Sequence, residues 1–146
     1  MLHQTIGLAI PTTLYFSFAI ADPRRGLPED ALMALPGVLA RVQRNRPFRL
    51  DAWVALPDRL DCIWTLPTGD LDVAGRWRAI RRGLADAVGP GLVRWQPARA
   101  ALPVTGMTEY ADLVRRCWFA PVRRGLVARP EDWAFSSIHR ESTAAV

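Results

Sequence analysis

The sequence predicts an α+β fold, a sandwich in which an antiparallel sheet carries helices packed on one face. Two segments, 48–56 and 59–66, alternate apolar and polar residues around a short Pro57-Asp58 turn, which is typical of a β-hairpin. Helical patterns lie before and after this hairpin, and no repeat or linker divides the chain. We therefore expect one domain over residues 1–146, with a C-terminal tail at about 126–146.

The chain before the hairpin supplies a strand and a helix. Residues 13–21, "TLYFSFAIA", are rich in aromatic side chains and stop at Asp22-Pro23, which favours a strand followed by a turn. From 28 to 46 apolar residues recur at helical spacing, and Arg46-Pro47 ends the segment. Because Pro36-Gly37 interrupts this pattern, we expect a kink or two short helices there.

Alternation within the hairpin predicts which side chains share a face of the sheet. The even-numbered residues of 48–56 are all apolar and are expected on one face, with Trp53 exposed on the other. The even-numbered residues of 60–66 are likewise expected in the core, opposite Arg59 and Asp61.

The second half of the chain supplies two further helices. The strongest helical pattern runs from Asp70, the expected N-cap, to Val88. Residues 92–104 are expected to form a loop with short extended pieces, and a third helix is expected over 108–119, ending before a proline. This order of strands and helices is that of a ferredoxin-like sandwich.

The charge of the chain favours a polyanionic partner. The formal net charge is +5, and all nineteen basic residues are arginine. A guanidinium can donate two parallel hydrogen bonds to phosphate oxygens, although codon bias in a G+C-rich genome also explains the absence of lysine. No window approaches the ~20 apolar residues of a membrane-spanning helix, so we expect a soluble, cytoplasmic protein whose residues 5–22 form a strand rather than a signal peptide.

Cysteine and histidine do not predict a metal site. Cys62 and Cys117 are isolated among apolar neighbours and are expected to be buried, reduced thiols. His3 and His139 lie near opposite ends of the sequence, with no third ligand at metal spacing.

Three segments resemble the REP-associated tyrosine transposases, single-tyrosine enzymes that cut and join single-stranded DNA. They are "DAWVALPDRLDCIWTLPTGD" at 51–70, "RWRAIRRGL" at 76–84 and "APVRRGLVARPEDWAFSSIHR" at 120–140. The last is the most specific, because it combines Pro-Val, two basic residues, Gly-Leu-Val, Asp-Trp, Ser-Ser and His-Arg in one order.

The resemblance implies a catalytic site whose residues differ here. In the family, a His-hydrophobic-His strand holds a divalent metal, a tyrosine on the following helix attacks the phosphate, and a polar residue four places later completes the metal site. The corresponding positions hold Arg59, Asp61, Arg116 and Ala120, and none of them matches. We therefore expect no metal cofactor. Tyr110 lies about 120° around the helix from the required face, so we expect it to pack at the helix start.

These observations predict a catalytically inactive, transposase-like protein, monomeric or dimeric, that binds single-stranded or hairpin DNA through arginines. A solvated helix face is the alternative for those arginines. An active transposase with non-standard residues, and a decaying gene product or small interaction protein, are the alternatives for the function. We also expect Asp61 to form an ion pair that bridges Arg59 and Arg116. The expected DNA-binding residues are Arg76, Arg78, Arg81, Arg82, Arg123 and Arg124.

Overall fold

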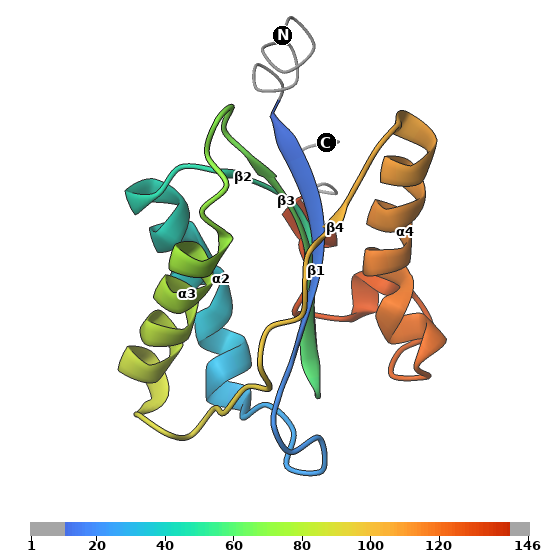
Figure 1. Ribbon diagram of the computed structural model, residues 1–146. Helices are drawn as coiled ribbons and strands as arrows, with labels where there is room; N and C mark the ends of the chain where they lie inside the picture. The colour runs from blue at the N-terminus through green and yellow to red at the C-terminus, as the bar shows by residue number, and fades with distance from the viewer. Residues whose placement is uncertain (1–10, 141–146) are drawn as a thin grey trace, which may run out of the picture.

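The computed structural model describes residues 11–140 and shows a four-stranded antiparallel sheet between helices (Figure 1). The sheet has the order β2-β3-β1-β4, which confirms the predicted α+β class and the hairpin. His3 and the first part of the 5–22 stretch lie outside the described residues. The elements are β1 (Thr12–Ala19), α2 (Glu29–Asn45), β2 (Arg49–Leu56), β3 (Arg59–Leu66), α3 (Val73–Val88), β4 (Leu102–Pro103), α4 (Met107–Arg123) and the 3-10 helix η1 (Pro130–Asp132).

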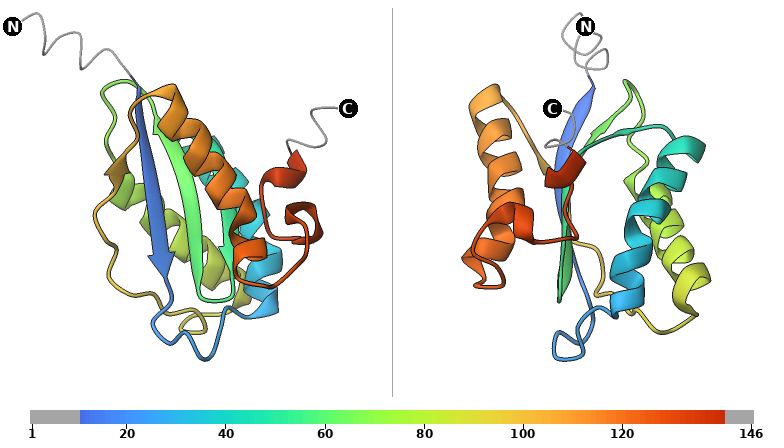
Figure 2. Two further views of the ribbon diagram at one scale, coloured as in Figure 1. Left: turned by 90° about the vertical axis from the view of Figure 1, so that its right-hand side faces the viewer. Right: turned by 180° about the vertical axis from the view of Figure 1, so that it is seen from behind.

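The helices cover both faces of the sheet, so the expectation of helices on one face holds only for α2 and α3. These two pack together on one side, while α4 and the segment after it lie on the other (Figure 2). The physical reason is that the sheet is apolar on both faces. Ala52, Val54 and Ile63 form a second core with the inner face of α4, separate from the core under α2 and α3.

A β-bulge in β2 changes which residues face each core. Leu50 pairs with Trp64 and Ala52 with the neighbouring Ile63, so Asp51 is an extra residue in the ladder. The alternation therefore reverses after Leu50. The prediction that all even-numbered residues of this strand share a face was wrong, and Trp53 is 7% exposed rather than open to solvent.

The α2 helix is continuous, so of the two expected forms, a kink or two short helices, the division into two helices is excluded. Pro36 lies inside it, and the predicted apolar stripe is buried. The α3 helix begins two residues later than the expected N-cap at Asp70 implies. Its N-cap is Asp72, whose Oδ1 accepts a hydrogen bond from the Gly75 N–H at 2.8 Å, because the carboxylate of Asp70 is bound to Arg76.

The α4 helix runs beyond its expected end at residue 119 and contains Pro121. It ends at Arg123, with Arg124 as the C-cap, and the next residue, Gly125, has a φ of 73°. The N–H of Leu126 then bonds to the carbonyl of Pro121 at 2.9 Å, which closes the last turn.

The two cysteines are buried in different cores, as free thiols, which confirms the prediction of reduced cysteines. Cys62 lies under α2 and α3, and Cys117 lies between α4 and the sheet. Burial raises the pKa of both thiols. Within residues 11–140 no helix is long and apolar enough to cross a membrane, and no three His, Cys, Asp or Glu side chains gather as a metal site.

Candidate nucleic-acid interface

The arginines expected to bind DNA divide between the two sides of the sheet. Arg78, Arg81 and Arg82 are exposed on α3, whereas Arg123 and Arg124 are exposed at the end of α4 (Figure 1). They therefore form two surfaces rather than one.

Arg76 is buried and is not available to a ligand. Its guanidinium and Nε bind five protein acceptors, which matches the number of N–H donors in the side chain. Two of these acceptors are the carboxylate oxygens of Asp70, at 3.0 and 2.7 Å, and this contact lowers the pKa of Asp70 to about 2. The other three are the backbone carbonyls of Arg46, Pro47 and Asp72.

A basic groove lies between α2 and α3. Two arginines line its α2 side, Arg41 within the helix and Arg46 at the C-cap. They lie opposite Arg78 and Arg82 of α3, across a cavity of about 420 Å³. Arg46 also contacts Asp72 at 3.2 Å, with both side chains about half exposed. Sequence reasoning missed the two arginines of the α2 side, although both lie outside its buried stripe.

Close packing of the two helices forms this groove. A Cβ on Gly83 would lie 2.7 Å from Cγ1 of Val38, so α3 needs glycine there to approach α2. Arg81 is exposed on the same helix but lies over the Trp77 ring, 5.8 Å from its centroid, and does not line the groove.

On the other side of the sheet, Asp61 is buried at 3% exposure and its carboxylate is bound by two strands. Oδ1 accepts a hydrogen bond from Ser17 Oγ at 2.6 Å, and Oδ2 lies 3.3 Å from Nε of Arg59. Burial is the largest influence on this carboxyl group, and its pKa is raised above the ordinary value.

The expected bridge through Asp61 therefore forms with Arg59 but not with Arg116. On α4, Cys117 is the residue that contacts Asp61, with Sγ 3.7 Å from the backbone carbonyl, and Arg116, one position earlier, is exposed. Ala120 is buried against the sheet. An α-helix turns by about 100° per residue, so Cys117 and Arg116 cannot both face the sheet.

These groups offer a divalent metal no open set of ligands. Arg59 has no lone pair to donate, and both carboxylate oxygens of Asp61 already have partners. Tyr15 lies near them, and burial together with the charge of Asp61 raises its pKa to about 12. Tyr110 is half-buried against the α4 core, as expected, and lines a cavity with Arg49.

The C-terminal segment that carries the most specific part of the resemblance covers the edge of β2. Ser137 Oγ accepts hydrogen bonds from the Trp53 N–H and from Nε1 of Trp118, both at 2.9 Å. Trp133 Nε1 donates to the carbonyl of Ala55 at 2.8 Å. The described part of the expected tail is therefore packed between β2 and α4 (Figure 2).

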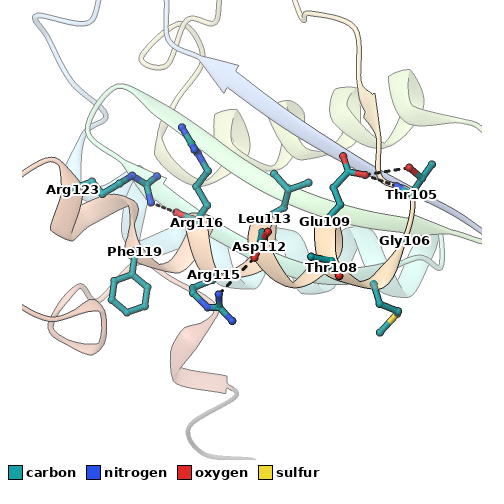
Figure 3. A pocket seen from close by; sticks show the side chains of 11 residues that line it. Thr105, Gly106, Thr108, Glu109, Asp112, Leu113, Arg115, Arg116, Phe119 and Arg123 are labelled. Atoms are coloured by element: carbon teal, nitrogen blue, oxygen red, sulfur yellow. Dashed lines mark hydrogen bonds and ion pairs between the residues drawn. The ribbon is translucent and has the colours of Figure 1, made fainter.

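The outer face of α4 is hollowed by a shallow cavity of about 1000 Å³ (Figure 3). Phe119 lines it and is 42% exposed, with Arg115, Arg116 and Arg123 on the same half of the helix. The sequence predicted an exposed aromatic side chain at Trp53, which is buried, and did not identify Phe119.

Comparison with known proteins shows similarity to REP-associated tyrosine transposases. A REP-associated tyrosine transposase of Escherichia coli (strain K12) is 35% identical over 129 residues, which are 88% of this chain and 78% of the relative. A solved structure of a REP-associated tyrosine transposase bound to a REP hairpin is similar with a TM-score of 0.82 and 34% identity, over 90% of this chain and 79% of that one. No protein-family model matches the chain.

Proposed function

Because the chain belongs to the REP-associated tyrosine transposase family, we propose that it is a DNA-binding protein that holds hairpin or single-stranded DNA without cutting it. The relative of known structure is bound to a REP hairpin, and the fold is shared along most of both chains. The observation that carries the proposal is the basic groove between α2 and α3, because it presents arginines to solvent at a fixed spacing.

The groove suits a phosphate backbone. Arg41, Arg78 and Arg82 surround a volume open to solvent, and each guanidinium can donate two hydrogen bonds to one phosphate. Asp86 also lines the groove, so the local charge is reduced but remains positive. Arg76 takes no part because its donors are all used within the protein.

Arg123 and Arg124 form the second candidate surface. Arg124 Nη2 donates to Asp58 at 3.2 Å and both side chains are about one-third exposed, whereas Arg123 Nη1 donates to the carbonyl of Arg116. Arg123 keeps its other donors for a ligand, so we assign it the larger part at this surface.

The proposed lack of cleavage follows from the residues at the four family positions. Arg59 and Arg116 cannot replace a neutral histidine ligand and a tyrosine nucleophile, and Ala120 has no polar group. An active transposase that uses other residues is the competing function, and a covalent DNA adduct would reveal it.

The dependence of hairpin affinity on salt tests the groove. Replacing both Arg78 and Arg82 by Ala should weaken binding and flatten the log–log salt slope by about 1.4 to 1.8, at roughly 0.7 for each phosphate contact to a single strand and roughly 0.9 for each contact to a duplex stem. Arg81→Ala is the matched control, because Arg81 is exposed on the same helix but lies outside the groove.

Three results would speak against the proposal. No binding of wild-type protein to hairpin, single-stranded or duplex DNA would overturn the function itself. An unchanged slope in the double variant would return Arg78 and Arg82 to the solvated-face interpretation. An equal effect of Arg81→Ala would show that overall charge, rather than the groove, determines affinity.

A further inference from the structure

The cavity on the outer face of α4 has no part in the binding groove, because the sheet separates them (Figures 1 and 3). Its lining combines an exposed aromatic ring with arginines, which is the chemistry that proteins use to hold unpaired nucleotides. The inner face of the same helix is already occupied, since Cys117 and Ala120 are buried against the sheet.

We propose that this outer face binds an unpaired segment of single-stranded DNA, with a base stacked on Phe119 and neighbouring phosphates at Arg115 and Arg123. The inference rests on the proposed function and specifies where unpaired bases of the same DNA lie.

The position of Phe119 supports a stacking role. It follows Arg115 by four residues and precedes Arg123 by four, so each of these residues is about one turn from the next along the helix. Figure 3 shows Phe119 and Arg115 pointing to the same side of α4. The aromatic rings of Trp64 and Trp77 are buried in the core under α2 and α3, so they cannot receive a base.

The charges along α4 favour a polyanion at its C-terminal half. Both acidic residues of the cavity, Glu109 and Asp112, lie in the N-terminal half. Glu109 accepts hydrogen bonds from Thr105, and Asp112 lies 3.6 Å from Arg115 in a largely exposed pair that a phosphate can displace. The half that contains Phe119 contributes arginines alone as charged groups.

Two oligonucleotides with the same number of phosphates separate stacking from charge. One is an unstructured oligothymidine, and the other is an abasic strand of equal length. Phe119→Ala should weaken binding of oligothymidine about tenfold, which is within the range for one stacked base, and leave binding of the abasic strand unchanged. Phe119→Trp should restore the affinity, and replacing both Arg115 and Arg123 by Ala should weaken binding of both strands.

Leu92→Ala is the matched control, because Leu92 is an exposed apolar residue, 59% accessible, outside the α4 cavity. The inference fails if Phe119→Ala binds oligothymidine like wild type, or loses both strands equally. It also fails if sedimentation shows that Phe119→Ala converts a dimer into a monomer, since the face would then hold a second copy of the chain. If wild-type protein still binds hairpin DNA, any of these results contradicts the inference but leaves the proposed function intact.

Discussion

Single arginines in this chain differ in role even when they are close in sequence. Arg76 is a buried structural residue, whereas Arg78, two positions later, faces solvent in the basic groove. Helical spacing predicts part of this difference. Arg76 lies three residues after Val73 and four before Ile80, so it falls on the buried side of the helix. The backbone carbonyls that make burial of this cation possible could not be predicted from local sequence. They come from two segments that are distant in sequence, the end of α2 and the loop before α3.

Asp61 offers a test at the scale of one residue, because its raised pKa means that burial makes the charged carboxylate less favourable in the folded protein than in the unfolded chain. Its pKa exceeds the ordinary 3.8, so the folded state holds the proton more tightly than the unfolded state does. The contribution of Asp61 to the free energy of unfolding therefore increases as the pH falls through its folded pKa. Above this pKa the side chain is charged, and the unfavourable effect of burying that charge is fully present.

We expect Asp61→Asn to be as stable as wild type at pH 7, or more stable, because asparagine keeps the shape and removes the buried charge. The difference in unfolding free energy between the two proteins should shrink as the pH is lowered towards 4, and denaturant unfolding at several pH values measures it. The other carboxyl groups titrate in both proteins and cancel in the difference. A variant that gains stability relative to wild type on acidification would contradict this reasoning.

Asp61→Ala is the comparison that removes the hydrogen bond from Ser17 as well as the charge. We expect a loss of about 1–2 kcal/mol, below the 3–5 kcal/mol of a fully buried pair, because the Arg59 side chain is 35% exposed and keeps access to water.

At the scale of elements, locally determined features could be predicted and long-range ones could not. The β2–β3 hairpin and the helical stripes follow from side-chain periodicity within each segment. The bulge at Asp51 could not be found in this way, because an alternating pattern has the same appearance with and without an extra residue. The packing of α4 on the second face also depends on Val54, which uninterrupted alternation placed on the opposite face of the sheet.

The C-terminal segment shows why a specific motif can have a structural role. By bonding to Trp53, Trp118 and Ala55, it covers the open edge of β2 and fastens that edge to α4. An uncovered edge strand presents unpaired backbone groups that promote association with other chains.

Ser137→Ala tests this connection between elements. The side chain is buried, and its loss leaves two donors, the Trp53 N–H and the Trp118 indole, without their acceptor. We expect a loss of about 2–3 kcal/mol in unfolding free energy, together with a greater tendency to aggregate. Ser136→Ala is the control, because Ser136 is also buried but its Oγ accepts only a local hydrogen bond from the N–H of Ile138. Equal losses in the two variants would argue against the fastening role of Ser137.

At the scale of the whole molecule, the sheet separates two basic surfaces. Sequence analysis had predicted their arginines as a single set of DNA-binding residues. The groove of α2 and α3 and the outer face of α4 lie on opposite sides (Figure 1), so one short rigid duplex cannot contact both without bending round an edge. Sequence could identify the arginines as phosphate ligands by chemistry, but only the fold assigns them to separate surfaces.

The residues at the four family positions, Arg59, Asp61, Arg116 and Ala120, include no tyrosine and no histidine, which gives the last prediction. A cleaving member of this family would attack the phosphate with a tyrosine next to a bound metal, and the candidates within residues 11–140 are Tyr15 and Tyr110. Tyr15 has a pKa of about 12, so its phenol stays protonated at neutral pH, and it lies beside the negative charge of Asp61, which opposes both deprotonation and the approach of phosphate. Tyr110 lines a cavity nearer the N-terminal end of α4, with Arg49, away from Asp61.

We therefore expect no covalent protein–DNA adduct when the chain is incubated with hairpin DNA and magnesium or manganese, denatured and separated by electrophoresis. The related transposase of Escherichia coli serves as the reference for the assay. Binding of the same hairpin must be measured in parallel, because absence of an adduct has meaning only when the DNA is held. An adduct on wild-type protein that disappears in Tyr15→Phe or Tyr110→Phe would overturn the prediction and identify the nucleophile, since the ring packing is preserved and only the hydroxyl that would attack phosphorus is lost.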